Sequence, residues 1–369
     1  MVPQWDLILY GACAGIDTQT IWHAAALARS RGIQENDILI IDWPKHPFVS
    51  CGFNQIMDQV VDIEYCESKN LPVYQRACGG GTVYLDSNQF FYHVITHINS
   101  SIVPRHVKSF YAKLLGPAVQ TCQHYGINAV YYPANEIRVD GRKISGNAAG
   151  LYEEAQALVG NILLEFPYDE MARILKVPNE DFRGTVRRLM ESGITSVRNQ
   201  IGFVPPRNEL LQTFVEYFES HLNLQLTPKS LHPETLALMY KLQKTPLKTE
   251  WPLSKTPQTQ TSIWKVKIHS DAFVVQRSFN TSSGLFRIQC GIQGSFLTEI
   301  RIIDKLGKIP SPLLPQLEQH LLQIDLRKVN LPEYIYSFLS RFDIEDLNLL
   351  SGDLAQSLFQ TYQSISQSP

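Results

Sequence analysis

The sequence has no strong excess of either charge and no long apolar run. Its 33 Lys and Arg residues stand against 35 Asp and Glu residues, which gives a formal net charge of −2. Because the two signs are nearly equal in number, the net charge does not attract the chain to nucleic acid or to an anionic membrane surface. No apolar stretch approaches the roughly 18 residues that a membrane-spanning helix requires. We therefore expect neither nucleic acid nor a membrane among the partners.

A cationic leader and paired cysteines are also lacking. The first residues, MVPQWDLILYGACAG, place no basic residue before their short apolar stretch, which disfavours a secretory signal. The six cysteines are scattered, and no two form a C-x-x-C pair. This scatter disfavours a disulfide framework and a zinc site. We expect a reducing, cytoplasmic setting in which most of these thiols are small core residues.

Two familiar phosphate-binding motifs are missing, but a glycine run is present. The chain has no G-x-x-x-x-G-K-[ST] and no G-x-G-x-x-G before a helix; it has RACGGGTVY at residues 76–84. Successive glycines let backbone N–H groups approach a ligand, so this turn can cradle a phosphate or a carboxylate-derived group. Arg76 can add a forked cation. Taken alone, the run is equally compatible with a plain glycine-rich hairpin.

A second polar segment, NEIRVDGRKISGNA, occupies residues 135–148. Its Asp140-Gly141 pair predicts a tight hairpin turn. Strand alternation then predicts that Lys143, Ser145 and Asn147 share one face. The small residues after Lys143 leave room for a substrate, although an exposed hairpin lysine is the simpler interpretation of this segment alone.

Composition divides the chain at residues 246–263, which are rich in Pro, Thr and Lys and read as an exposed linker. Residues 1–245 mix helices with strands that neighbour in sequence, which predicts an α+β fold with mixed and antiparallel sheets and packed helices. Residues 264–369 predict a small C-terminal α+β domain without an evident chemical cluster.

Periodicity predicts the individual elements. We expect helices at 18–30, capped by Asp17 or Thr18, at 55–69 and at 106–126, the last broken at Gly116-Pro117. The expected strands are 37–43, 48–51, 73–76, 82–86, 90–98, 136–146, 155–166, 264–270, 284–292 and 296–304, followed by helices at 312–324 and 333–342.

The order of the two polar segments resembles the signature of lipoate–protein ligases and their acyltransferase relatives in the lipoyl/biotinyl protein ligase superfamily. That signature is R-x-[ST]-G-G-G-x-V-x-x-D followed by N-[DE]-I…G-[RK]-K-I-[SA]-G-[SN]-A. The stretches PFVSCGFNQ, GNILLEFPYDEMARILKVPNE and ITSVRNQIG are also similar to family stretches, so the resemblance covers about residues 5–205. Residues 264–369 are placed like the accessory domain of bacterial-type lipoate ligases.

The resemblance implies a reaction in which an acid carboxylate attacks the α-phosphate of ATP and pyrophosphate leaves. The acyl-adenylate then acylates a lysine on a small lipoyl-type acceptor domain. The implied cofactors are ATP and Mg²⁺, and the acid is lipoate or octanoate. Lys143 is the implied catalytic residue, and Glu136 is implied near the nucleotide and its metal. The residues implied to bind the acyl-adenylate are Arg76, Cys78, Gly79, Gly80, Gly81, Thr82, Gln89, Asn135, Gly146, Asn147 and Ala148.

Three positions depart from the family pattern and leave alternatives open. Leu85 and Val159 replace family histidines, and Gln89 replaces an asparagine. One alternative is an octanoyl or lipoyl transferase that consumes no ATP and is assisted either by a lysine or by Cys78 as the thioester-forming residue. Its relatives carry their cysteine elsewhere, and residues 128–132 supply none. A non-catalytic acyl- or acceptor-binding relative is a second alternative, and biotin ligation is a minor one because no G-R-G-R loop occurs.

His93 and His97 stand four residues apart in an expected strand. Four strand residues span about 13 Å, which is too far for two ligands of one metal ion. We interpret both as ordinary sheet residues.

Overall fold

The computed structural model describes residues 2–244 and 263–366, which fold as two compact units. The first contains the chain up to Lys176 and again from Ile194 to 244. The second contains Val177–Gly193 and the chain from 263 onward. The expected linker at 246–263 lies outside the described residues except for Ile263.

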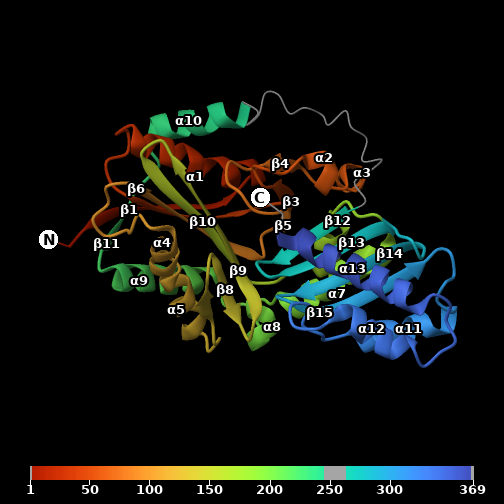
Figure 1. Ribbon diagram of the computed structural model, residues 1–369. Helices are drawn as coiled ribbons and strands as arrows, with labels where there is room; N and C mark the ends of the chain where they lie inside the picture. The colour runs from red at the N-terminus through yellow and green to blue at the C-terminus, as the bar shows by residue number, and fades with distance from the viewer. Residues whose placement is uncertain (1, 245–262, 367–369) are drawn as a thin grey trace. The chain divides into compact units, whose positions relative to one another are not determined.

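A mixed sheet runs through the first unit. Its strands are β1 Gln4–Cys13, β2 Ile38–Pro44, β6 Gln89–His97, β7 Val130–Tyr132, β8 Glu136–Val139, β9 Arg142–Tyr152, β10 Ala155–Leu163 and β11 Gln225–Pro228. They form one eight-stranded sheet in the order β11-β1-β2-β6-β10-β9-β8-β7 (Figure 1). β1 is parallel to both of its neighbours, and the other pairs are antiparallel. The expected mixed α+β fold is confirmed.

A small sheet carries the glycine run. Its strands are β3 Phe48–Cys51, β4 Val73–Gln75 and β5 Val83–Leu85, in the order β4-β3-β5. The run therefore connects the two outer strands, β4 and β5, past the Cys51 end of β3. The helix expected at 55–69 is instead two short helices, α2 Met57–Val60 and α3 Ile63–Ser68, because Val61 between them is extended and bridges to Leu175.

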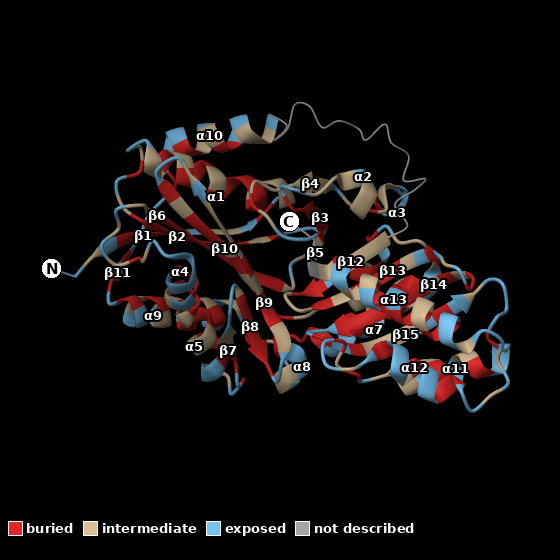
Figure 2. Cartoon of the chain, in the orientation of Figure 1, coloured by how far each residue is buried: buried red, intermediate tan, exposed pale blue. Residues whose placement is uncertain are grey.

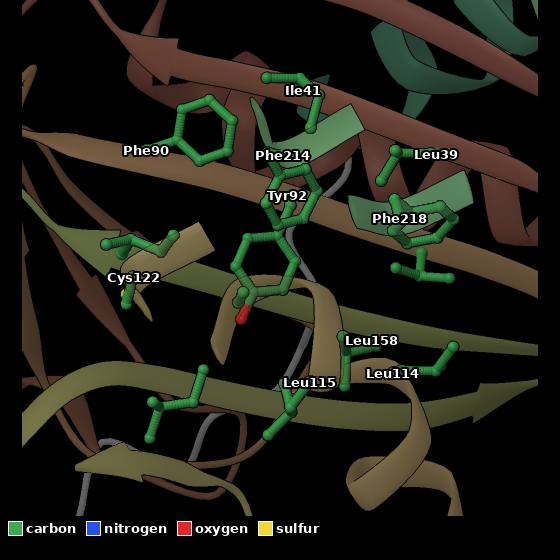
Figure 3. Close-up of a cluster of buried hydrophobic side chains, with 14 of the residues drawn as sticks. Leu39, Ile41, Phe90, Tyr92, Leu114, Leu115, Cys122, Leu158, Phe214 and Phe218 are labelled. Atoms are coloured by element: carbon green, nitrogen blue, oxygen red, sulfur yellow. The ribbon is translucent and has the colours of Figure 1, made fainter. Parts of the chain in front are cut away.

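Helices cover both faces of the eight-stranded sheet (Figure 1). One face carries α1 Gly15–Ser30 and α10 Pro233–Lys244; the other carries α4 Val107–Leu114, α5 Gly116–His124 and α9 Arg207–Leu222. Because side chains alternate along a strand, β6 contributes to the cores on both faces of the sheet. Tyr92 packs with Phe214 and Phe218 of α9 (Figure 3), whereas Ile95 packs with Trp22 of α1 on the other face. The central strands are accordingly buried on both sides (Figure 2).

Two predictions about helix ends had different outcomes. The break at Gly116-Pro117 is confirmed, since α4 ends at Leu114 and α5 begins at Gly116. The predicted cap of the first helix was wrong: α1 begins at Gly15 after Ala14. Asp17 lies inside its first turn, where its carboxylate accepts a hydrogen bond from the Ala14 N–H at 3.2 Å.

The second unit is built on an antiparallel sheet. Its strands are β12 Ile263–His269, β13 Ala272–Asn280, β14 Leu285–Gln293 and β15 Phe296–Asp304, paired in chain order. Its helices are α7 Glu180–Gly193, α11 Leu314–Leu321, α12 Leu331–Leu339 and α13 Leu347–Ser366. The expected C-terminal α+β domain is confirmed, although β13 and α13 were not expected. Shorter elements elsewhere are α6 Tyr168–Arg173, α8 Val197–Ile201 and the 3₁₀ turn Ser311–Leu313.

Helix α7 leaves the first unit in sequence and packs in the second. Its apolar side chains Phe182, Val186 and Leu189 are buried. A methyl group on Gly291 of β14 would lie 3.0 Å from a Leu189 methyl carbon, so α7 covers this sheet closely. No helix within residues 2–244 and 263–366 is long and apolar enough to cross a membrane.

Candidate active site

Arg76 organises the glycine loop, which we define as residues 76–82. Its guanidinium donates hydrogen bonds to the carbonyl oxygens of Gly79 at 3.0 Å and Gly81 at 2.7 Å, and to that of Ser50 in β3 at 3.0 Å. One planar fork thus fixes three backbone oxygens. Arg76 shapes the loop from within, a role that the sequence alone did not predict.

Close backbone contact sets the position of the loop. A methyl group on Gly52 would lie 1.9 Å from the Gly80 carbonyl oxygen, so only glycine is accommodated after β3. Gly80 itself has a φ of +107°, which glycine adopts readily. Thr82, which is buried, donates to the side-chain oxygen of Gln55 at 3.1 Å, and this oxygen also accepts from the Gly52 N–H at 3.0 Å.

The glycines of the loop turn the carbonyl oxygens of Gly79 and Gly81 inward to Arg76, and their amides behave differently. Among the described residues, no acceptor receives the backbone N–H groups of Gly79, Gly80 and Gly81. Gly80 and Gly81 are exposed, and Gly79 is partly so. A row of such N–H groups at a bend can bind an anionic group.

The hairpin of β8 and β9 presents Lys143. Its turn has positive φ at Asp140 (49°) and Gly141 (79°), which confirms the predicted tight turn. A register shift between Ile137 and Arg138 then interrupts the alternation. As a result, Lys143 lies over Gly146, where an added methyl group would come within 3.3 Å of its Nζ.

The prediction that Lys143, Ser145 and Asn147 share a face was wrong. Ser145 and Asn147 turn instead to the core around Tyr92, whose hydroxyl donates to the Asn147 side-chain oxygen at 2.6 Å. Asn147 also donates to the Asn135 carbonyl at 3.0 Å, and the Asn135 side chain donates back to the Asn147 carbonyl. These asparagines tie the loop before β8 to β9.

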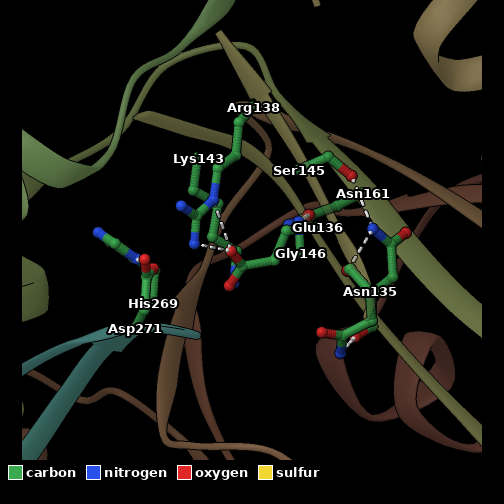
Figure 4. A network of polar contacts seen from close by, with 10 residues as sticks. Asn135, Glu136, Arg138, Lys143, Ser145, Gly146, Asn161, His269 and Asp271 are labelled. Carbon is green, nitrogen blue, oxygen red and sulfur yellow. Dashed lines mark hydrogen bonds and ion pairs between the residues drawn. The ribbon is translucent and has the colours of Figure 1, made fainter. Parts of the chain in front are cut away.

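Lys143 shares a carboxylate with a buried arginine (Figure 4). Its Nζ lies 3.4 Å from Glu136 Oε1, while Arg138 donates to Glu136 Oε2 at 2.7 and 3.0 Å. Glu136 and Arg138 are only 2% and 4% exposed, so both charges are held out of water. Arg138 was not anticipated from the sequence.

A polar chain continues from Lys143 toward β6. The Gly146 N–H beneath the lysine donates to the Asn161 side-chain oxygen at 2.9 Å. Asn161 in turn donates to Gln89 at 2.6 Å, and Gln89 donates to the Tyr84 carbonyl beside the glycine loop. Gln89 is buried and therefore acts in the structure by orienting Asn161.

The two polar segments of the sequence meet in space. Cys78 of the glycine loop and Ala148 of β9 belong to one apolar cluster, together with Val159 of β10. Tyr152 at the end of β9 donates its hydroxyl to the Ala77 carbonyl at 2.9 Å. The structure thus brings together the loop and the lysine strand around a partly buried apolar surface.

All six cysteines are buried. Burial raises the pKa of every one of these thiols. At Cys78 the nearby Arg76 guanidinium opposes this shift without reversing it. Thiolate formation is therefore disfavoured at each position.

The residues around Glu136 do not fit Mg²⁺. A magnesium site needs several oxygens able to face one cation. Here both carboxylate oxygens of Glu136 already face protein cations, Arg138 and Lys143. Within the part of the chain that the structure describes, no group of three His, Cys, Asp or Glu residues is arranged to hold a metal. We derive no step through a metal.

His93 forms a buried pair with Asp42 of β2. His93 Nε2 lies 3.1 Å from Asp42 Oδ2, and burial raises the pKa of Asp42 although His93 opposes the shift. His97 lies 3.5 Å from Glu154 instead. The two histidines thus have separate partners.

Comparison with known proteins identifies the family. The profile described as the lipoyl protein ligase A/B catalytic domain matches residues 22–219, more than half of the 369-residue chain. Lipoate–protein ligase 1 of Staphylococcus aureus is 29% identical over 196 residues, which are 53% of this chain and 54% of that protein. The octanoyltransferase LipM of Kyrpidia tusciae is 22% identical over 269 residues, 67% of this chain and 97% of that protein. This chain spans about half the length of the curated ligases it matches.

Solved structures show the same fold. A bi-partite lipoate protein ligase from Thermoplasma acidophilum, studied with its E2 lipoyl domain, superposes with a TM-score of 0.59 at 20% identity, covering 68% of this chain and 96% of that one. Lipoate-protein ligase A bound with ATP gives a TM-score of 0.53 at 20% identity, covering 65% and 94%. The matched profile spans both the glycine loop and the β8–β9 hairpin, and the chain belongs to the lipoyl protein ligase A/B catalytic domain family.

Proposed function

We propose that this protein is a lipoate–protein ligase. It activates lipoate or octanoate with ATP and transfers the acyl group to a lysine of a lipoyl-type acceptor domain, and residues 1–245 carry this chemistry. The observation that supports a ligase most directly is the chemistry available at the site. A cation, Lys143, and unpaired loop amides are present there, whereas every thiol is buried with a raised pKa.

The two chemical steps both place negative charge on oxygen. In the first, the acid's carboxylate attacks the α-phosphate of ATP, the bond to the β-phosphate side breaks, and pyrophosphate leaves. In the second, the acceptor lysine's amine attacks the acyl carbonyl, loses a proton, and AMP leaves. Preorganised cations and N–H donors stabilise such charge by about 10²–10³ in rate for each donor.

The residues take the following proposed roles. Lys143 bridges the α-phosphate and the acyl carbonyl, and the N–H groups of Gly79 to Gly81 receive the adenylate. Arg76 acts by holding the loop in shape, since its donors are spent on loop carbonyls. Cys78 and Ala148 line the acyl chain. Thr82, Gln89, Asn135 and Asn147 support these groups from behind, and Gly146 leaves space for the lysine.

An ATP-independent octanoyltransferase is the second candidate function. It is favoured by the length match, because the LipM relative aligns over 97% of its own length, against 54% for the Staphylococcus ligase. That candidate requires a reactive thiol or another acyl carrier within the site.

Mass spectrometry of an acceptor domain separates the two candidates. The protein is incubated with a lipoyl-domain acceptor and free lipoate, with and without MgATP. A lipoyl mass shift that requires MgATP is expected. Modification from octanoyl–carrier protein without ATP, and none from the free acid, would replace the ligase by the transferase.

A further inference from the structure

Glu136 is a buried carboxylate between two cations with unequal contacts. Arg138 makes two hydrogen bonds to Oε2, at 2.7 and 3.0 Å. Lys143 Nζ lies 3.4 Å from Oε1, longer than an optimal N–H···O bond. The arginine therefore fixes the carboxylate, and the contact between the carboxylate and Lys143 is the longer of the two.

Arg138 is itself immobilised. Its guanidinium carbon lies 3.7 Å from the ring centre of Tyr132 in β7, and its side chain is nearly buried. Stacking on an aromatic face and a forked bond to a carboxylate are contacts that lysine could not reproduce. Tyr132, Arg138 and Glu136 thus form a rigid support across β7 and β8.

Lys143 and Glu136 differ in how far they are exposed. The Lys143 side chain is 24% exposed, against 3% for that of Glu136. The carboxylate is therefore buried behind the ammonium, which lies over Gly146 on the more exposed side of the pair.

We propose that Glu136, fixed by Arg138, is a positioning residue for Lys143 rather than a magnesium ligand. This inference rests on the proposed function, in which Lys143 meets the acyl-adenylate. Glu136 holds the Lys143 ammonium in position over β9 before substrate binds. The ammonium then contacts the phosphate and acyl oxygens when the substrate is bound.

The first experiment measures lipoylation by Glu136→Gln, Lys143→Ala and the double variant. Glu136→Gln should lower kcat about tenfold and leave the Mg²⁺ concentration for half-maximal rate within about twofold. In the Lys143→Ala background, it should cost less than about twofold more, because its effect passes through the lysine. The inference would be overturned by a tenfold rise in the Mg²⁺ concentration for half-maximal rate. It would also be overturned if Glu136→Gln lowered kcat about tenfold in the Lys143→Ala background, as it does in the parent.

Asp6→Asn is the matched control. Asp6 is also a carboxylate of low exposure, at 2%, and it lies 3.1 Å from Lys229 Nζ in the same unit. Its substitution removes a comparable buried charge away from the site. We expect kcat to stay within about twofold of the parent, so that a tenfold loss at Glu136 is not a general effect of removing such a group.

A readout without turnover separates this inference from the proposed function. Brief acetylation with an N-hydroxysuccinimide ester, followed by peptide mass spectrometry, reports how readily each lysine reacts. Glu136→Gln should raise the initial rate at Lys143 by about threefold or more and leave Lys229 unchanged, because a carboxylate that favours the unreactive ammonium form of Lys143 is removed. Unchanged Lys143 labelling would overturn the positioning role even in an active ligase. If Lys143 labelling rises as expected but the protein cannot lipoylate an acceptor, the positioning role of Glu136 is supported and the proposed function is contradicted.

Discussion

The glycine loop and the β8–β9 hairpin prepare their groups for anions in opposite ways. In the loop, the cation Arg76 is spent on carbonyl oxygens, and backbone amides remain for a ligand. In the hairpin, the anion Glu136 supports a side-chain cation, Lys143. The loop therefore depends on shape, which sterics control, and the hairpin depends on charge.

If the hairpin supplies the principal charge, its lysine gives the largest effect. Lys143→Ala should lower kcat/KM for lipoylation by about 100-fold while the fold stays intact, because one transition-state donor is lost. Steady-state kinetics and circular dichroism check this. Lys229→Ala, which removes a half-exposed lysine of the same unit, should stay within about twofold. Full activity of Lys143→Ala would remove the site assignment.

If the loop depends on shape, one methyl group should disrupt it. Gly52→Ala would place carbon 1.9 Å from the Gly80 carbonyl oxygen, so backbone must move. We expect about a tenfold loss of activity and about 2 kcal/mol of lost stability. Denaturant unfolding and kinetics measure both. Gly352→Ala in α13, where the methyl group meets nothing within 4 Å, is the steric control.

The reverse side of the hairpin should matter for stability more than for rate. Tyr92→Phe removes the buried donor to the Asn147 side chain and should cost about 1–2 kcal/mol. Activity at a temperature below unfolding should change by less than about threefold. A tenfold fall in kcat without loss of stability would show that Asn147 acts directly on substrate, against the orientation seen here.

The smallest effect is expected at the thiol of the loop. Cys78→Ala should lower lipoylation by less than about threefold, because burial raises the pKa of Cys78 and no thioester is required. Intact-protein mass spectrometry should detect no acylated enzyme in the parent. An acyl adduct on the parent enzyme that disappears in Cys78→Ala would contradict this expectation. It would show that the loop supplies a nucleophile, Cys78.

The sequence predicted the elements that local patterns encode. Asp140-Gly141 predicts the hairpin turn, and Gly116-Pro117 predicts the helix break. The order of the two motifs implies that the glycine loop and Lys143 lie close together. The side of β9 on which each residue lies could not be predicted, because the register shift opposite Arg138 depends on pairing with β8. An alternating pattern of residues in one strand does not predict a bulge, because the bulge forms only when the strand pairs with its neighbour.

Arg138 and α7 were missed for a related reason. An arginine within NEIRV reads as a solvated strand residue, and only the approach of Tyr132 and Glu136 shows that it is buried. Helix α7 has an evident apolar stripe, but a stripe does not specify its partner. Both cases are decided by contacts between segments that are separate in sequence.

Because α7 precedes part of the first unit in sequence but belongs to the second unit, the second unit cannot be removed by a simple C-terminal truncation. The chain enters that unit at Val177 and returns at Ile194, next to Thr195, whose N–H donates to the Lys143 carbonyl at 2.8 Å. A chain shortened before residue 245 would retain α7 but lose β12 to β15, leaving Phe182 and Val186 without cover. Such a truncation would expose the apolar side chains of α7 to solvent and promote aggregation. A stable chain without the C-terminal unit would therefore also need polar replacements at the apolar positions of residues 177–193.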